Sequence, residues 1–205
     1  MAFVIAVAQQ KGGAGKSTLA ANLAVALLEH GPVPLLDTDP QQSLARWHNI
    51  RGEGPLGFEA PAGWRVTGAL DRLRRLPGFV VMDTPPHVES DARLAIRAAQ
   101  HVLIPLQASL PDLWASEATI KLAEAEKRAW HYVMNRMPPQ GRVRDVVMEE
   151  LARRGAPVLD AALGNRSAFP AAFALGQGVT ESAPRSVAAT EMRALASSLR
   201  RIAGQ

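Results

Sequence analysis

The 205-residue sequence contains no cysteine, which excludes disulfide bonds, iron–sulfur clusters and thiol chemistry. It has no run of about 18 or more apolar residues, so no membrane-spanning helix is expected. Met1 lies two residues from the first apolar stretch, which leaves no room for a signal peptide. The five histidines have no metal-ligand spacing. These absences favour a cytoplasmic protein.

The composition, 47% hydrophobic and 20% charged, is typical of a packed globular fold. The length suits one α/β domain and is too short for two ordinary ones. No internal repeat or low-complexity segment interrupts the chain. We therefore expect a single domain over residues 1–205.

Positive charge is concentrated in the last third of the sequence. Residues 1–127 hold 12 Lys/Arg against 13 Asp/Glu, whereas residues 128–205 hold 11 Arg against 6 Asp/Glu. These two parts have net charges of −1 and +5, which sum to the +4 of the whole chain. The basic third is either a generally soluble, arginine-rich surface or a non-specific nucleic-acid face. Charge alone favours the soluble surface.

A glycine-rich stretch, Gln10–Thr18, lies between an apolar strand pattern and an apolar helical pattern. That order is the context of a phosphate-binding loop, in which small residues let successive N–H groups converge on an anion. The following helix adds its N-terminal dipole. Lys16 supplies a charge for the outer phosphates, and the Ser17 hydroxyl can ligate Mg²⁺. The loop deviates from the ordinary motif, because Gln10 replaces the first glycine and Lys11 adds a second lysine.

Three aspartates follow apolar strand patterns, at the positions where α/β folds bind ligands. Asp83 ends the run Phe79–Asp83, which is the Walker B pattern and predicts a carboxylate that helps to hold Mg²⁺. Asp37 and Asp39 lie at the end of the neighbouring predicted strand, 33–37, where two carboxylates need a cation or ordered water between them. The alternative role, an N-cap of the next helix, fits Asp39 partly and Asp37 poorly.

Apolar runs alternate with helical patterns, which predicts a three-layer α/β fold with a mostly parallel central sheet flanked by helices. Trp47, Trp64, Trp114 and Trp130 are expected to pack in the interior. The predicted strands are 3–8, 33–37, one near Phe58, 79–83, 101–106, 130–135 and a short one at 157–159. The predicted helices are 16–30, 42–48, 66–76, 90–99, 112–128, 142–154, one from after Arg166 to Leu175, and 186–202.

The motifs K-G-G-x-G-K-S-T, D-x-D-P-Q and four apolar residues followed by D-T-P-P occur in this order. Together they resemble the ParA/MinD family of deviant Walker ATPases, with the short, ParF-type plasmid partition proteins as the nearest type. The resemblance covers essentially the whole chain and implies a P-loop NTPase fold that uses ATP and Mg²⁺.

The resemblance also implies residue roles. Lys11 would reach the phosphates across a dimer interface, Ser17, Asp37 and Asp83 would serve Mg²⁺, and Asp39 would orient the attacking water. Asn135 would contact adenine, although it could equally be a turn residue. The implied nucleotide contacts are Lys11, Gly12, Gly13, Ala14, Gly15, Lys16, Ser17, Thr18 and Asn135, and the implied catalytic residues are Lys11, Lys16 and Asp39.

The implied function is that of a slow, switch-like partitioning ATPase. ATP would form a homodimer, the dimer would bind double-stranded DNA without sequence preference, and a ParB-like adaptor on the cargo would stimulate hydrolysis. The protein would then be associated with the nucleoid. The first candidates for DNA contacts are Arg142, Arg144 and Arg166, followed by Arg153, Arg154, Arg185, Arg200 and Arg201.

Two alternatives remain open. One is a metabolic ATP-dependent ligase or synthetase on the same fold, which would not need Lys11 with D-x-D-P-Q. The other is a MinD-like membrane ATPase, in which the amphipathic 186–202 helix would bind lipid. Trp and Lys are absent from that helix, so we expect it to cover the sheet and membrane binding to be unlikely.

Overall fold

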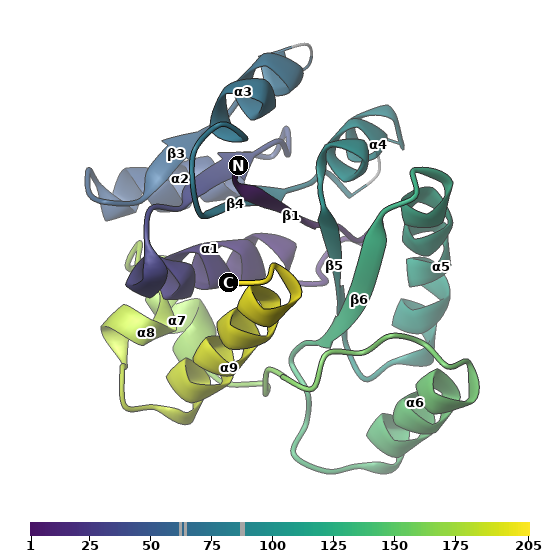
Figure 1. Cartoon of the computed structure of the whole chain (residues 1–205). Coiled ribbons are helices and arrows are strands. Elements are labelled where there is room, and N and C mark those ends of the chain that lie inside the picture. The colour runs from purple at the N-terminus through teal and green to yellow at the C-terminus, as the bar shows by residue number, and fades with distance from the viewer. Residues whose placement is uncertain (62, 64, 87–88) are drawn as a thin grey trace.

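The computed structural model describes residues 1–61, 63, 65–86 and 89–205 (Figure 1). Six parallel strands form one sheet in the order β3-β2-β4-β1-β5-β6, which confirms the predicted fold class. The strands are β1 (Phe3–Val7), β2 (Pro34–Asp37), β3 (Gly57–Glu59), β4 (Phe79–Asp83), β5 (His101–Leu106) and β6 (Ala129–Met134).

Helices cover both faces of the sheet, as a parallel sheet requires (Figure 1). Side chains of β1 alternate between the faces: Ile5 and Val7 pack with α1 and α9, whereas Val4 and Ala6 pack with α3 and α4. The helices are α1 (Lys16–Leu27), α2 (Ser43–Arg51), α3 (Arg65–Leu73), α4 (Glu89–Ala98), α5 (Leu110–Ala125), α6 (Arg142–Arg153), α7 (Ala168–Ala174), α8 (Val179–Ser182) and α9 (Val187–Ile202), with a 3₁₀ turn at Leu28–His30.

The central strand β1, buried from Val4 to Val7, positions the site. It pairs with β4 and β5, and β4 also pairs with β2, so the carboxyl ends of these strands lie side by side. Asp83 lies opposite Val7 on one side and Asp37 on the other. The order of strands therefore brings two segments 46 residues apart in the chain to the start of the glycine-rich loop.

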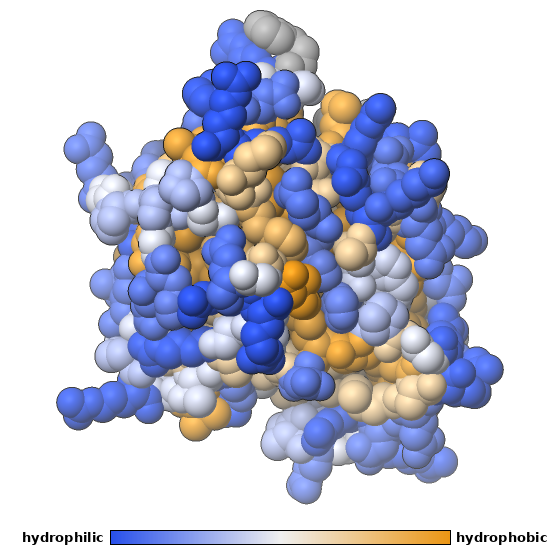
Figure 2. Space-filling view, in the orientation of Figure 1, coloured by the Kyte–Doolittle hydropathy of each residue, from blue (hydrophilic) through white to orange (hydrophobic). Residues whose placement is uncertain are grey.

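Helix α9 covers the sheet, as expected. Its side chains Met192, Leu195 and Leu199 are fully buried in the core that also contains α1. Within the described residues, no helix is both long and apolar enough to cross a membrane. Figure 2, drawn in the orientation of Figure 1, shows that hydrophilic side chains cover most of the visible surface, while apolar ones gather near its middle.

Two predictions are wrong, and one helix was not predicted. Segment 157–159 is not a strand, because it forms only an isolated bridge between Tyr132 and Val158 beside β6. Helix α8 was not predicted. Trp114 is 57% exposed rather than buried, whereas Trp47 is buried; Trp64 lies outside the described residues.

Candidate nucleotide-binding site

The glycine-rich loop lies between β1 and α1. Gly13 and Gly15 have φ angles of 78° and 86°, in the left-handed region that favours glycine. Gly15 precedes the first turn of α1, so the unpaired N–H groups of that turn face the loop. The predicted phosphate-binding geometry is therefore present in the backbone.

Lys16, the first residue of α1, is 7% exposed. Burial lowers the pKa of its ammonium group, while the nearby carboxylates of Asp83 and Asp39 oppose that shift. A buried ammonium group in the first turn of a helix is suited to an anionic phosphate, because little water screens its charge. Lys16 is thus placed as the motif predicts.

Asp83 is completely buried at the end of β4. The Ser17 hydroxyl donates a hydrogen bond of 2.6 Å to its Oδ2, whereas its Oδ1 is buried with no partner among the described residues. Burial raises the pKa of this carboxyl group to about 7, and the hydrogen bond from Ser17 and the charge of Lys16 partly oppose the rise. A buried carboxylate oxygen without a donor is suited to a cation or to a water bound to one.

Asp37 ends β2 and Asp39 lies two residues further on, as predicted. Their hydrogen bonds to the start of α2 differ from the N-cap alternative considered for them. Asp37 accepts hydrogen bonds from the backbone N–H groups of Asp39 and Ala45, both at 3.0 Å. Its carboxylate therefore binds one N–H of the first turn of α2, although the N-cap residue of that helix is Gln42. The Asp39 carboxylate accepts a hydrogen bond of 2.9 Å from the backbone N–H of Gln41. Burial raises the pKa of the Asp37 carboxyl group.

These residues fit a magnesium ion that is held together with a nucleotide. Ser17 and Asp83 are in direct contact, and Asp37 lies beside Asp83 in the sheet register. Among the described residues, no group of three or more His, Cys, Asp or Glu side chains could hold a metal ion. Mg²⁺ is usually held by few protein ligands, several waters and substrate phosphates.

Lys11 is partly exposed, unlike the buried residues of this cluster. Its ammonium group forms an ion pair with Asp112 in the first turn of α5. The Lys11 side chain is 43% exposed and that of Asp112 only 5%. The sequence did not predict Asp112, which is 101 residues away. Lys11 is therefore held at the surface beside its own loop rather than with Lys16.

A pocket of about 620 Å³ adjoins the loop on the side of β5 and β6. Gly15 and Thr18 lie on one side of it, and Asn135 and Arg136 on another. The Asn135 amide donates a hydrogen bond of 2.9 Å to the carbonyl of Ala14. The pocket has room for a nucleoside next to the phosphate loop, and Asn135 touches both.

Gln107 and Arg136 are site residues that the sequence analysis missed. Both side chains donate to the carbonyl of Gly13, each at 3.1 Å. The available signal was their position directly after β5 and β6, at the edge of the sheet where α/β folds bind ligands.

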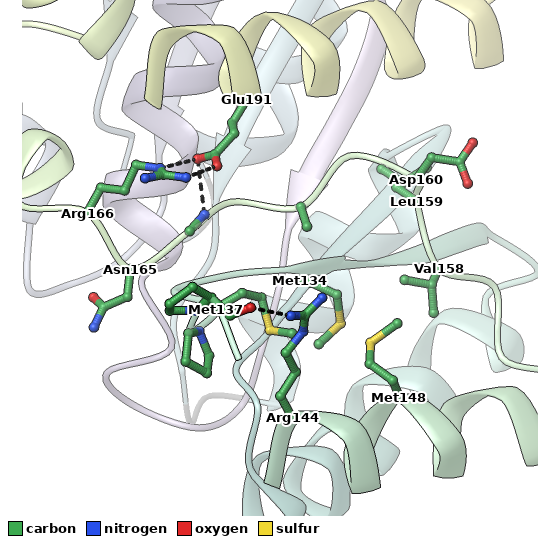
Figure 3. Close-up of a pocket in the computed structure, with 14 residues that line it drawn as sticks. Met134, Met137, Arg144, Met148, Val158, Leu159, Asp160, Asn165, Arg166 and Glu191 are labelled. Atoms are coloured by element: carbon green, nitrogen blue, oxygen red, sulfur yellow. Dashed lines mark hydrogen bonds and ion pairs between the residues drawn. The ribbon is translucent and has the colours of Figure 1, made fainter. Parts of the chain in front are cut away.

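The arginines predicted to bind DNA differ in their surroundings. Arg166 is paired with Glu191 of α9 by bonds of 2.9 and 2.6 Å, and Arg144 donates to the carbonyl of Pro139 at 2.5 Å (Figure 3). Arg142 forms no side-chain hydrogen bond or ion pair with any described residue, and it lies at the start of α6. Of these three arginines, Arg142 therefore has the charge that is most available to a partner.

The fold and the site together define a P-loop nucleotide-binding protein. The chain belongs to the CobQ/CobB/MinD/ParA nucleotide binding family, whose domain model matches residues 5–179. This confirms the resemblance that the motifs indicated, and the predicted cofactors, ATP and Mg²⁺, are consistent with that family.

Two relatives and one solved structure illustrate what the chain is similar to. It is 30% identical over 203 residues to the maintenance of carboxysome distribution protein A of Halothiobacillus neapolitanus, covering 93% of this chain and 92% of that protein. It is 30% identical over 185 residues to the protein ParA of Rhizobium radiobacter, covering 84% and 83%. A plasmid partition protein of Borrelia burgdorferi B31 bound to AMPPNP has the same fold, with a TM-score of 0.79, 17% identity and coverage of 98% and 100%.

Proposed function

We propose that this protein is a positioning ATPase in which ATP and Mg²⁺ drive formation of a homodimer that binds DNA without sequence preference. A cargo-bound adaptor then stimulates hydrolysis and releases the dimer. ATP is hydrolysed slowly to ADP and phosphate, with Lys16 stabilising the phosphates and Asp39 orienting the attacking water. The cargo is a plasmid, a chromosome or another large body such as a carboxysome.

The placement of Lys11 is the observation that supports this proposal most. A lysine that served its own phosphate loop would be expected near Lys16 and Asp83. Lys11 instead has a partly exposed ammonium group at the side of the loop. Such a cation can reach the nucleotide of a second subunit, which makes the γ-phosphate part of the dimer contact. Hydrolysis would then weaken the dimer.

The same site supports the roles proposed for the other residues. Ser17 and Asp83 would hold Mg²⁺, with Asp37 in its outer shell, and Asn135 would lie between the loop and the adenine. The basic residues of the last third would bind DNA phosphates, and dimerisation would double their number. Binding through phosphates alone carries no sequence preference.

The proposal is tested by measuring retention on double-stranded DNA, and mass by light scattering, with ATP, ADP or no nucleotide. We expect DNA retention and a dimer only with ATP, and loss of both in Lys16→Ala. Lys11→Ala should still bind ATP but remain a monomer. Asp39→Ala should stay dimeric with ATP, because it binds but does not hydrolyse. DNA retention that is independent of ATP would exclude the switch.

The two alternative functions have separate readouts. A metabolic ligase would turn over ATP only with a small acid and would be indifferent to DNA. A MinD-like protein would float with liposomes when ATP is present. The buried apolar side of α9 leaves little apolar surface on that helix for lipid, so we expect no flotation.

A further inference from the structure

The phosphate loop is held from outside by three side chains. The carbonyl of Gly13 accepts from Gln107 Nε2 and Arg136 Nη1, both at 3.1 Å, and the carbonyl of Ala14 accepts from Asn135 at 2.9 Å. Gln107 follows β5, whereas Asn135 and Arg136 follow β6. Two neighbouring strands thus supply every one of these donors.

These contacts determine which way the N–H groups of the loop point. In a trans peptide the C=O of one residue and the N–H of the next are coplanar and point in opposite directions. Donors that fix the carbonyls of Gly13 and Ala14 therefore turn the N–H groups of Ala14 and Gly15 to the opposite side. The loop needs such restraint, because the two flanking glycines, Gly13 and Gly15, have little conformational preference of their own.

Arg136 is itself held in an uncommon conformation. Its φ angle is 51°, in the left-handed region that non-glycine residues rarely adopt. Its backbone N–H donates to the Asn135 side chain at 3.0 Å, which supports this turn. The turn lets Asn135 and Arg136 reach neighbouring carbonyls of the same loop. Arg136 also lines the 620 Å³ pocket beside the loop, so its fixed positive charge faces the space where a nucleotide would bind.

We infer that Arg136, together with Gln107, is a positioning residue of the phosphate loop and holds the N–H groups of Ala14 and Gly15 toward the phosphates of the nucleotide. This role concerns nucleotide binding by a single subunit. It requires neither the dimer nor the DNA binding of the proposed function. Arg136 thereby couples the nucleoside pocket to the phosphate loop, because it contacts both.

The test is a titration of each purified variant with mant-ADP and Mg²⁺, with the melting temperature of the nucleotide-free protein measured alongside. Arg136→Met should weaken binding about tenfold, the loss expected for one charge-assisted hydrogen bond. Arg136→Lys keeps the charge and should recover part of the affinity. Gln107→Glu has the same size but places a carboxylate against the Gly13 carbonyl, so it should weaken binding more than Gln107→Ala.

The matched control is Arg75→Met. Arg75 is exposed and lies shortly before β4 begins, at the edge of the sheet opposite the loop, and its loss should leave the affinity unchanged. The double variant Arg136→Met/Gln107→Ala should lose more than the sum of the single changes, because it removes both side-chain donors from the Gly13 carbonyl. The inference would be overturned if the affinities of Arg136→Met and Gln107→Glu for mant-ADP were both within twofold of the wild-type affinity. Gln107→Glu keeps the test decisive if Arg136→Met folds poorly.

Discussion

Asp83 combines full burial with a carboxylate oxygen, Oδ1, that accepts no hydrogen bond from any residue the structure describes. Without a cation this arrangement costs stability, because a buried charge needs a partner. Asp83 therefore lowers the stability of the protein when the site is empty, but provides an oxygen for a bound cation. Such a trade-off between stability and function is common in active sites.

We predict that Asp83→Asn raises the melting temperature in metal-free buffer by about 2–6 °C, which corresponds to roughly 1–2 kcal/mol in a protein of this size. It should also abolish the additional stabilisation that Mg²⁺ gives to the ADP complex. Differential scanning fluorimetry with and without Mg²⁺ and ADP measures both effects. Asp71→Asn, at an exposed position, is the control. A lower melting temperature of Asp83→Asn in metal-free buffer would contradict this account.

The site residues that could be predicted from the sequence lie in continuous motifs. Lys16, Ser17 and Asp83 lie where their motifs placed them, because a loop between a strand and a helix has few possible geometries. Asp112 and Arg136 were not predicted, because their contacts span 101 and 123 residues of chain. Such contacts depend on the order of the strands, which periodicity does not specify.

Strands and long helices were predictable because their apolar patterns are continuous. Helix α8 was not, since its four residues provide no complete period. Segment 157–159 is apolar but meets β6 only through Tyr132, whose backbone bonds to Pro157 and Leu159 at 2.8 and 2.9 Å. The two segments run parallel there, but the contact stays an isolated bridge among the described residues, so an apolar run was not enough to make a strand.

Helices α2, α7 and α8 are joined at one tight point. A Cβ atom at Gly176 would lie 2.4 Å from the backbone nitrogen of Arg51, so the glycine lets two backbones meet. The Arg51 guanidinium donates to the Gly176 carbonyl and pairs with Glu181 at 2.8 and 2.6 Å. This junction attaches the end of α2, which follows the Asp37 segment, to the C-terminal helices.

We predict that Gly176→Ala destabilises the protein by more than about 3 kcal/mol, because strain and a backbone clash combine. Gly155→Ala is the matched control. Gly155 has a similar φ angle, 59° against 66°, but open space around it, so only the strain of about 1 kcal/mol remains. Urea unfolding of both variants gives the difference. Equal losses would show that the helices do not pack as closely as described.

On the scale of the whole molecule, positive charge in the last third is partly cancelled within the chain. Arg153 and Arg154 pair with Glu150, and Arg166 pairs with Glu191. The excess of arginine in the sequence therefore overstates the charge that is available to DNA. Arg142 remains open, whereas Arg166 links α9 to the segment beside the nucleoside pocket.

We predict that Arg142→Ala weakens ATP-dependent DNA retention and reduces the salt dependence by about two phosphate contacts per dimer. Arg166→Ala should change the salt dependence less and should lower thermal stability, because Glu191 loses its cationic partner and, among the described residues, keeps only the N–H of Gly164. Fluorescence anisotropy on a labelled duplex at several salt concentrations separates the two. An equal salt effect of both variants would mean that Arg166 breaks its ion pair with Glu191 and contacts a phosphate when DNA binds.

The ion pair between Lys11 and Asp112 has a consequence for the proposed cycle. If Lys11 crosses to the nucleotide of a second subunit, Asp112 and the γ-phosphate compete for one ammonium group. The outcome then depends on which anion carries more charge, and a γ-phosphate carries more than a carboxylate. Loss of that phosphate would return Lys11 to Asp112. Each separated subunit would then carry its own counterion for Lys11, and this would disfavour a new dimer while ADP is bound.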